Sequence, residues 1–465
     1  MKKRIIALLC LLALAISMVA TGCQGKVVAY KRGTPVQVSK VNWRGIDEDE
    51  MIIGCYIGPQ DFYAAVGYSL PSLITDESYS KLAECGVNAI IEQRMRYDSE
   101  VGMRAVELAG KYGITYYMGD NGVMYTDVVD PAAAKIGTVE EVAARMKELM
   151  EYEGFGGFYL RDEPTSNLFP MLNEAVDVIY QAREIAGDTT IKGFINAFPR
   201  VGASQLSANT DSTMNWEKYL TGICETGVEY LSWDGYPFTN VPGEIQASYL
   251  NALGTSSEFA KKYNIPLFFW IQCGGYEPMF GPSHRVVNEG ELHYNVGSAL
   301  CFGAKGFAYY TGVTPPEAAL KGEDVVNNDS LLNKYGSKTP FWYYAKNIDD
   351  QVKAIDHVLL NAAHEGVIVD DEGPNIYTGD LKLDSYRCFK GFSGDSALIG
   401  CFDYEGTVAL LVMNNSIENH HAVVTLEFDN NYEYEVTQRA QTDTISGKEF
   451  SLHLEAGEFA LVVVQ

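Results

Sequence analysis

Short apolar runs alternate with segments of helical periodicity through residues 51–310, and this alternation is the strongest constraint on the fold. Each run holds consecutive apolar or β-branched residues between turn-forming residues, which is typical of a buried strand. We expect eight strands, at Met51–Ile57, Val87–Glu92, Ile114–Gly119, Gly157–Asp162, Ile191–Asn196, Val228–Asp234, Pro266–Gln272 and Gly306–Tyr310.

The segments between these runs carry helix signals. Thr138–Glu151 begins with a capping threonine and two glutamates, and Glu174–Ile185 places its apolar residues on one stripe. Repeated strand–helix–strand units require parallel pairing, and eight of them favour a closed (β/α)8 barrel, a TIM barrel. An open doubly wound sheet is the alternative, but it would need a glycine-rich phosphate turn, which Gly58-Pro59-Gln60-Asp61 does not provide.

From Ala397 onward the apolar residues repeat with a period of two, which predicts strands without helices. The runs are Thr407–Met413, His421–Phe428, Tyr432–Gln438 and Phe459–Val464, with turn residues at Asp429–Asn431 and Gly457. We expect a small antiparallel β-sandwich at 366–465. It follows the barrel, 46–365, whose last long helix is predicted at Thr339–Leu360.

The N-terminus has the layout of a secretory signal: Lys2, Lys3 and Arg4 precede an apolar stretch, Ile5–Ala20. A transmembrane helix is the alternative, but the stretch is short for one. The ending Ala20-Thr21-Gly22-Cys23 resembles the lipobox of bacterial lipoproteins. This resemblance implies a leader at 1–22, lipidation of Cys23, a tether at 23–45, and attachment to the cell membrane or cell surface outside the cytoplasm.

The chain is strongly acidic, with a formal net charge of −26, which argues against nucleic acid or anionic lipid as a binding partner. Seven cysteines lie beyond Cys23, an odd number without CxxC spacing, so we expect buried thiols rather than a disulfide framework. No predicted strand ends in histidine, and no HExxH, GxSxG or Walker motif occurs. We therefore expect neither a metal site nor a cofactor.

Polar and aromatic residues gather where the predicted strands end, which in a (β/α)8 barrel is where the active site lies. Amide, carboxylate and aromatic groups around one opening suit a sugar, whose hydroxyls donate and accept hydrogen bonds and whose apolar faces stack on rings. The candidate substrate-binding residues are Glu92, Asp120, Asn121, Asn196, Trp233, Tyr236, Trp270, Gln272, Tyr309 and Tyr310. For Trp233 and Trp270 core packing is an equal alternative, and Arg94 and Arg96 either bind a carboxylate or are solvated.

The fourth predicted strand ends in Asp162-Glu163-Pro164. Two acids at the rim of a sheet can be partly desolvated and tuned for proton transfer. The alternative is structural, with Asp162 as a helix cap and Glu163 as a charge on a helix dipole.

In layout and motifs the chain resembles the clan-A glycoside hydrolases, in particular the family-42 β-galactosidases. Asp162-Glu163-Pro164 lies where that clan has Asn-Glu-Pro, Asp234-Gly235-Tyr236-Pro237 matches its turn after strand six, and Gly303–Gly306 is similar to its entry into strand eight. The resemblance implies a carbohydrate substrate, with Glu163 as general acid/base and Asp162 as its helper.

The clan's nucleophile is a glutamate at the end of strand seven, where this chain has Gln272. An amide cannot form the covalent glycosyl ester, so another acid must act. Glu277 is the nearest substitute in the same loop, and Asp234 or Glu92 could instead be the base of an inverting pair. The hypotheses are therefore a glycosidase, a non-catalytic carbohydrate-binding lipoprotein on a degenerate barrel, or a partner-binding module.

Overall fold

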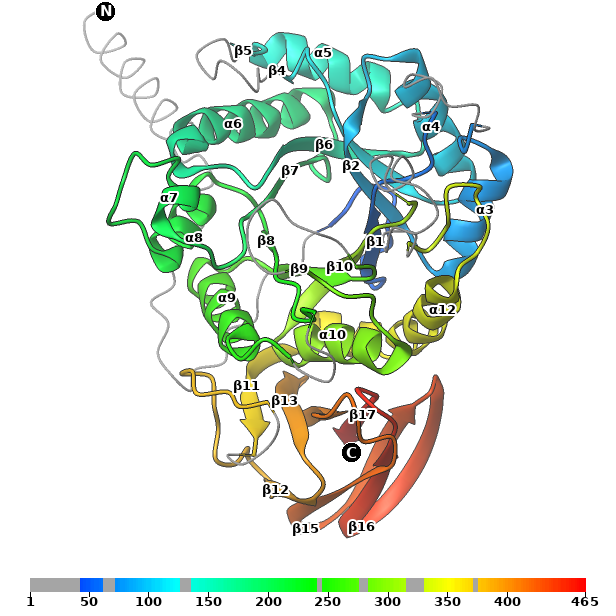
Figure 1. Ribbon diagram of the computed structural model, residues 1–465, viewed down its shortest axis with the longest axis vertical. Helices are drawn as coiled ribbons and strands as arrows, with labels where there is room; N and C mark the ends of the chain where they lie inside the picture. Colours follow the sequence, from blue (N-terminus) through cyan, green and yellow to red (C-terminus); the bar gives the residue numbers. More distant parts are fainter. Residues whose placement is uncertain are drawn as a thin grey trace, which may run out of the picture.

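The computed structural model describes residues 42–61, 72–125, 135–240, 245–275, 283–314, 330–370 and 375–465. It consists of a parallel barrel ringed by helices and an antiparallel sheet packed beside it (Figure 1). All eight predicted barrel strands are present: β1 Ile52–Tyr56, β2 Ala89–Arg96, β3 Thr115–Gly119, β6 Phe155–Asp162, β7 Lys192–Asn196, β8 Leu231–Asp234, β9 Leu267–Gln272 and β10 Ala304–Tyr310.

The barrel strands pair in the order β7-β6-β3-β2-β1-β10-β9-β8, with every pairing parallel. The two end strands meet through a parallel bridge between Ala197 and Trp233, where the Ala197 N–H donates to the Ser232 carbonyl at 2.9 Å. The sheet is therefore nearly closed, which confirms the predicted barrel over the open sheet.

Helices cover the outside of the barrel (Figure 1). They are α3 Asp76–Cys85, α4 Glu100–Lys111, α5 Val139–Leu149, α6 Phe169–Ala186, α7 Ala203–Leu206, α8 Trp216–Glu225, α9 Tyr249–Tyr263, α10 Glu289–Cys301, α12 Pro340–Lys353 and α13 Asp356–Asn361. As predicted, Thr138 caps α5, in a capping box with Glu141.

The single helix predicted at Thr339–Leu360 is wrong, because the segment forms α12 and α13 with a break at Ile355. Ile355 is buried, and the carboxylate of Asp356 accepts a hydrogen bond from the Met51 N–H at 3.2 Å. The break thus directs the Asp356 side chain towards the residue before β1. Helical periodicity does not reveal this contact.

Residues just before β1 close the amino-terminal end of the barrel. The Trp43 ring, 9% exposed, packs inside the barrel against Tyr117, Phe194, Tyr230 and Phe268. The next residue, Arg44, pairs with Asp188 at 3.0 Å and donates to three carbonyls, those of residues 150, 152 and 155. Residues 42–45 therefore belong to the barrel, and the predicted tether of 23–45 is too long at its carboxyl end.

The C-terminal region forms the predicted antiparallel domain. Its strands are β11 Ala363–Val369, β12 Phe389–Gly394, β13 Ala397–Tyr404, β14 Thr407–Asn414, β15 Ala422–Gln438, β16 Gln441–Leu454 and β17 Phe459–Val464. They make one connected sheet, because β15 pairs with β12 along its first half and with β17 along its second. The turn predicted at Asp429–Asn431 is instead a bulge within β15, since β16 pairs with both halves of that strand.

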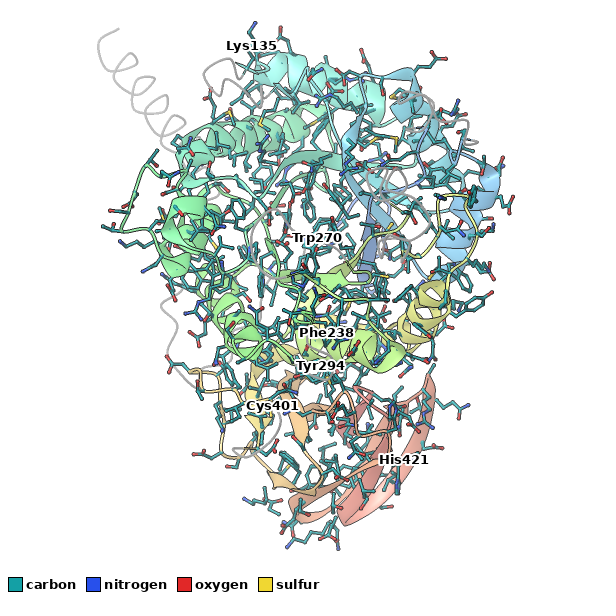
Figure 2. The ribbon with its side chains drawn as sticks, in the orientation of Figure 1. Lys135, Phe238, Trp270, Tyr294, Cys401 and His421 are labelled. Carbon is teal, nitrogen blue, oxygen red and sulfur yellow. The ribbon has the colours of Figure 1, made fainter. Side chains whose placement is uncertain are left out.

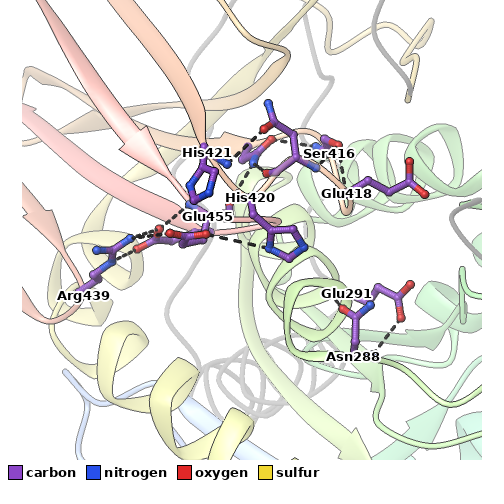
Figure 3. A network of polar contacts seen from close by, with 11 residues as sticks. Asn288, Glu291, Ser416, Glu418, His420, His421, Arg439 and Glu455 are labelled. Carbon is purple, nitrogen blue, oxygen red and sulfur yellow. Dashed lines mark hydrogen bonds and ion pairs between the residues drawn. The ribbon is translucent and has the colours of Figure 1, made fainter.

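The two domains meet along α10, which lies against β13 and β14 (Figure 1). The Tyr294 hydroxyl donates to the Asn415 side chain at 3.1 Å, and a Cβ at Gly297 would lie 2.7 Å from the Met413 sulfur. Figure 3 shows polar contacts on either side of this junction: Asn288 caps α10 in the barrel, and Arg439 faces Glu455 in the C-terminal domain. The close packing indicates a fixed junction rather than a loose linker.

The predicted buried thiols are confirmed for the described cysteines. All seven are free, and six of them are buried, Cys388 being the exception. Across the ranges given above, no helix is both long and apolar enough to cross a membrane.

Replacing Trp43 by alanine is expected to destabilise the barrel by about 3–5 kcal/mol, because it removes a buried aromatic ring that fills the amino-terminal end of the barrel interior. Urea denaturation followed by far-UV circular dichroism measures the change. Tyr343→Ala serves as the control, since that ring is 60% exposed. A loss below about 1 kcal/mol for Trp43→Ala would show that the ring is not part of the core.

Candidate active site

The side chains at the strand ends divide into two sets, because alternate residues of a barrel strand face the interior and the helices. Asn196, Asp234 and Trp270 face the interior. Trp233 faces outward and packs on Trp216 and Phe269, at ring-centroid distances of 5.2 and 4.9 Å. Trp233 is therefore part of the core between barrel and helices, and its predicted sugar-binding role has no support.

Tyr309 also faces outward. Its hydroxyl donates to Asp349 of α12 at 2.7 Å, and the ring is fully buried. The neighbouring Tyr310 faces the carboxyl-end opening of the barrel, which we call the mouth. Of the two adjacent tyrosines in the prediction, only Tyr310 is positioned to meet a substrate.

A buried chain of hydrogen bonds leads to the acids at the mouth. The Trp270 indole N–H donates to Ser232 Oγ at 3.0 Å, and the Ser232 hydroxyl donates to Asn196 Oδ1 at 3.0 Å. Asn196 Nδ2 then donates to Asp162 Oδ1 and to Asp234 Oδ1, each at 3.2 Å. Because an indole can only donate, the direction of every bond in the chain follows, and Asn196 must present its nitrogen to both carboxylates.

Asp162 receives two further hydrogen bonds, both on Oδ2. The donors are the Tyr56 hydroxyl and the Gln93 amide, each at 3.4 Å. Burial raises the pKa of Asp162, while its hydrogen-bond donors act in the opposite direction. The donors thus offset part of the effect of burial on Asp162.

Glu163, directly after it, is held differently. Its N–H donates to the Asn196 carbonyl at 2.9 Å, and its φ of 42° lies in the left-handed region that non-glycine residues seldom adopt. Burial raises the pKa of Glu163 to about 10, and the charges of Asp234 and Asp162 add to the effect. At neutral pH Glu163 therefore carries a proton, as a general acid must.

Asp234 completes what we call the acidic wall, formed with Asp162 and Glu163. It is 8% exposed, and burial followed by the charge of Asp162 raises the pKa of Asp234 to about 8. The three carboxyls titrate as a coupled group and share fewer than three negative charges at neutral pH. The wall can hold a proton and an anion side by side.

Aromatic rings line the mouth beside the acidic wall and opposite it. Tyr310 stacks on Tyr56 with centroids 5.7 Å apart and planes 16° apart, and it lies 5.4 Å from Tyr236. Trp270, near the centre of the barrel in Figure 2, meets Tyr56 edge-on at 5.5 Å and is 2% exposed, so it forms the floor. Rings of this kind suit the apolar face of a sugar.

Gln272 is a structural amide. Fully buried, it accepts from the Phe238 N–H and donates to the carbonyls of Phe238 and Arg285, all at 3.0 Å. It ties the loop after β8 to the loop after β9, and all its donor hydrogens are used. The prediction that it binds substrate has no support in this geometry, and Glu277, its proposed substitute, lies outside the described residues.

Glu92 does not reach the mouth. It is fully buried on the helix side of β2, where it accepts from the Gln60 amide at 2.7 Å and from the Arg94 N–H at 2.8 Å. Burial, followed by the charge of Glu92, raises the pKa of the Cys55 thiol, which likewise faces the helices. This position argues against Glu92 as the base of an inverting pair.

Asp120 has a structural role. Its carboxylate pairs with Arg145 of α5 at 2.9 Å and accepts from the Gly122 N–H at 2.8 Å, while Asn121 is exposed on the same loop. Arg96 pairs with Asp98 at 3.0 Å. These residues hold loops at the rim, and among the described residues no cluster of histidine, cysteine and acid is placed to bind a metal.

Sequence reasoning did not select Tyr56, and it did not list Gln93 as a binding residue. The signal was present for Tyr56, which stands near the end of the first predicted strand on the inward parity. His284, whose ring meets Tyr236 edge-on at 5.9 Å, lies in a loop, where strand parity gives no guidance.

No family model and no curated protein matches the chain. Among solved structures, it is similar to a catalytic mutant of Gan42B, a family-42 β-galactosidase from G. stearothermophilus, with a TM-score of 0.55, 6% identity, and coverage of 92% of this chain and 100% of that one. An Anoxybacillus α-amylase matches with a TM-score of 0.48 and 12% identity, covering 90% of this chain and 98% of that one. The β-galactosidase match confirms the predicted resemblance at the level of the fold.

We expect Glu163→Gln to make thermal stability less dependent on pH. A carboxyl whose pKa is raised in the folded state stabilises fully below its unfolded pKa, and this contribution is lost as pH rises towards about 10. One such group changes the free energy of unfolding by about 1.4 kcal/mol per pH unit. Melting curves from pH 5 to 9 should fall less steeply for the variant; parallel curves would mean that Glu163 is ionised throughout.

Proposed function

We propose that this chain is a glycoside hydrolase that cleaves O-glycosidic bonds of oligo- or polysaccharides outside the cytoplasm, with Glu163 as general acid/base. The observation that carries the proposal is the pair of adjacent acids, with Asp162 held by hydrogen bonds from Asn196, Tyr56 and Gln93 and with the pKa of Glu163 raised by burial and by its neighbouring acids. Both stand at the carboxyl end of a (β/α)8 barrel, where such folds carry their active sites.

The residues at the mouth fit the steps of glycoside cleavage. Glu163 would give its proton to the glycosidic oxygen as that bond breaks, and its carboxylate would then take a proton from the attacking water. Asp162 and Asp234 would stabilise the positive charge that develops on the sugar ring. Tyr236 and Tyr310 would stack on the sugar, which fixes its position relative to Glu163.

The rival proposal is a carbohydrate-binding protein without catalysis. One observation favours it: Gln272, at the position of the clan's nucleophile, is fully engaged with backbone. A binding site, however, has no need of a partly buried glutamate whose pKa is raised, since placing an acid out of water beside two others is costly.

Glu163→Gln is expected to lower kcat by about 10²- to 10⁴-fold, because the amide cannot donate a proton to the leaving group. The loss should be smaller with aryl glycosides, whose leaving groups need little protonation. Release of reducing sugar and of nitrophenol from a panel of oligosaccharides and aryl glycosides measures both effects.

Glu174→Gln is the matched control, since that glutamate is exposed on α6. The rival would be favoured if the protein bound oligosaccharides but released no sugar from any member of the panel, with Glu163→Gln binding equally well.

The proposed location rests on Cys23. Cys23→Ala is expected to abolish incorporation of labelled palmitate and to release the protein from the membrane fraction. The measurement is fluorography and fractionation of cells that express the full chain. A variant that is still labelled and membrane-bound would exclude lipidation at Cys23.

A further inference from the structure

The acidic wall occupies one side of the mouth. Asp162 ends β6, Glu163 follows it, and Asp234 ends β8. Asn196 of the intervening β7 donates hydrogen bonds from one nitrogen to both aspartates. The strand order places β1 directly across the barrel from β7, and Tyr56 of β1 reaches over to Asp162. A hydrolase with two protein carboxylates needs them on opposite faces of the sugar, about 5–5.5 Å apart for retention or about 6.5–9.5 Å apart for inversion.

The described residues across the mouth do not supply that second carboxylate. The side chains there are Tyr56, Gln93 and Tyr310. The Tyr56 hydroxyl donates a hydrogen bond to Asp162. Burial and the neighbouring acids raise the pKa of Tyr56 well above its usual range, so Tyr56 does not act as an anionic nucleophile. Gln272 is engaged with backbone. None of these described side chains is therefore placed to supply the attacking group.

We propose that the substrate itself supplies it, and that the sugar cleaved is a β-linked 2-acetamido-2-deoxyhexose whose acetamido oxygen attacks the anomeric carbon while Asp162 binds the acetamido N–H. This inference rests on the proposed function. The β linkage follows from chemistry, because in a gluco- or galacto-configured sugar the acetamido group can displace only a leaving group trans to it.

The steps balance without a protein nucleophile. In the first, the acetamido oxygen bonds to C1, the C1–O bond to the leaving group breaks, and the Glu163 proton passes to that leaving oxygen. The product is an oxazolinium ion whose N–H⁺ is bound by the Asp162 carboxylate. In the second, the Glu163 carboxylate takes a proton from water, the water oxygen bonds to C1, and the C1–O bond of the oxazolinium breaks to restore the acetamido group with net retention.

The surroundings of Asp162 suit an acetamido N–H as a hydrogen-bond partner. An ionised carboxylate has about four lone-pair sites, and around those of Asp162 lie Asn196, Tyr56, Gln93 and the Tyr159 hydroxyl, so a substrate N–H would replace one of these donors. The three bonds, at 3.2–3.4 Å, fix the carboxylate from both oxygens. One donor, Tyr56, belongs to a cluster with Tyr310 and Trp270, which places apolar rings where an acetamido methyl group would pack.

The test compares aryl β-glycosides on the unaltered protein. Aryl N-acetyl-β-glucosaminide and N-acetyl-β-galactosaminide should be cleaved, and the corresponding β-glucoside and β-galactoside should not. Replacing the acetyl hydrogens by one, two and three fluorines should lower kcat/KM progressively, because each fluorine makes the carbonyl oxygen a weaker nucleophile. A thiazoline analogue of the oxazoline intermediate should inhibit competitively.

Asp162→Asn adds a measurement on the protein. It should lower kcat on the N-acetyl substrate by about 10²- to 10³-fold, since a neutral amide cannot stabilise the charged ring. Asp177→Asn, exposed on α6, is the matched control. Thermal melting shows whether Asp162→Asn folds, and the fluorinated series decides the question if it does not.

The results that would overturn the inference differ in whether the proposed function survives them. Cleavage of glycosides without an acetamido group at comparable kcat/KM, or a rate indifferent to fluorination, would exclude the acetamido mechanism and leave the glycosidase standing. Loss of that cleavage in Glu277→Gln, with recovery in azide, would identify the nucleophile instead. No cleavage of any glycoside would remove the proposed function and this inference together.

Discussion

The arrangement of the mouth depends on one amide group. Asn196 donates from a single nitrogen to Asp162 and Asp234. The hydrogen bond that its Oδ1 accepts from Ser232, which in turn accepts one from Trp270, fixes the orientation of the amide. A buried network of this kind is stable only when every member is satisfied, and then it is rigid. Asp162 is thereby fixed at the end of β6, and burial, followed by the charges of Asp234 and Asp162, raises the pKa of the adjacent Glu163. One amide thus sets the positions of the two carboxylates that act on Glu163.

The barrel could be predicted from the sequence because its strands are buried on both faces and appear as continuous apolar runs. The break at Ile355 could not, since it depends on a contact between Asp356 and the distant Met51. The bulge in β15 was missed for the same reason: Asp429–Asn431 has turn composition, and only the pairing with β16 shows that the strand continues.

The candidate site was predicted in part. Position along the chain was enough to select Glu163, Asp162 and Asp234, because a strand end in a barrel has a known place. Position along the chain did not show that Trp233 and Tyr309 point away from the barrel interior, because that depends on which face of the strand each residue occupies. For the same reason it did not show that Glu92 lies on the helix side of β2. Gln272 was recognised as a departure from the clan, but its tie to the loop backbone at Phe238 is visible only in three dimensions.

Trp43 and Arg44 fix the direction in which the chain enters the barrel. Both are held at the amino-terminal end, opposite the mouth, by the barrel interior and by the carbonyls of residues 150, 152 and 155. The first described residues of the chain therefore join the barrel at the end opposite the acidic wall. The opening that holds the acids and the point where the chain enters the barrel lie at its two opposite ends.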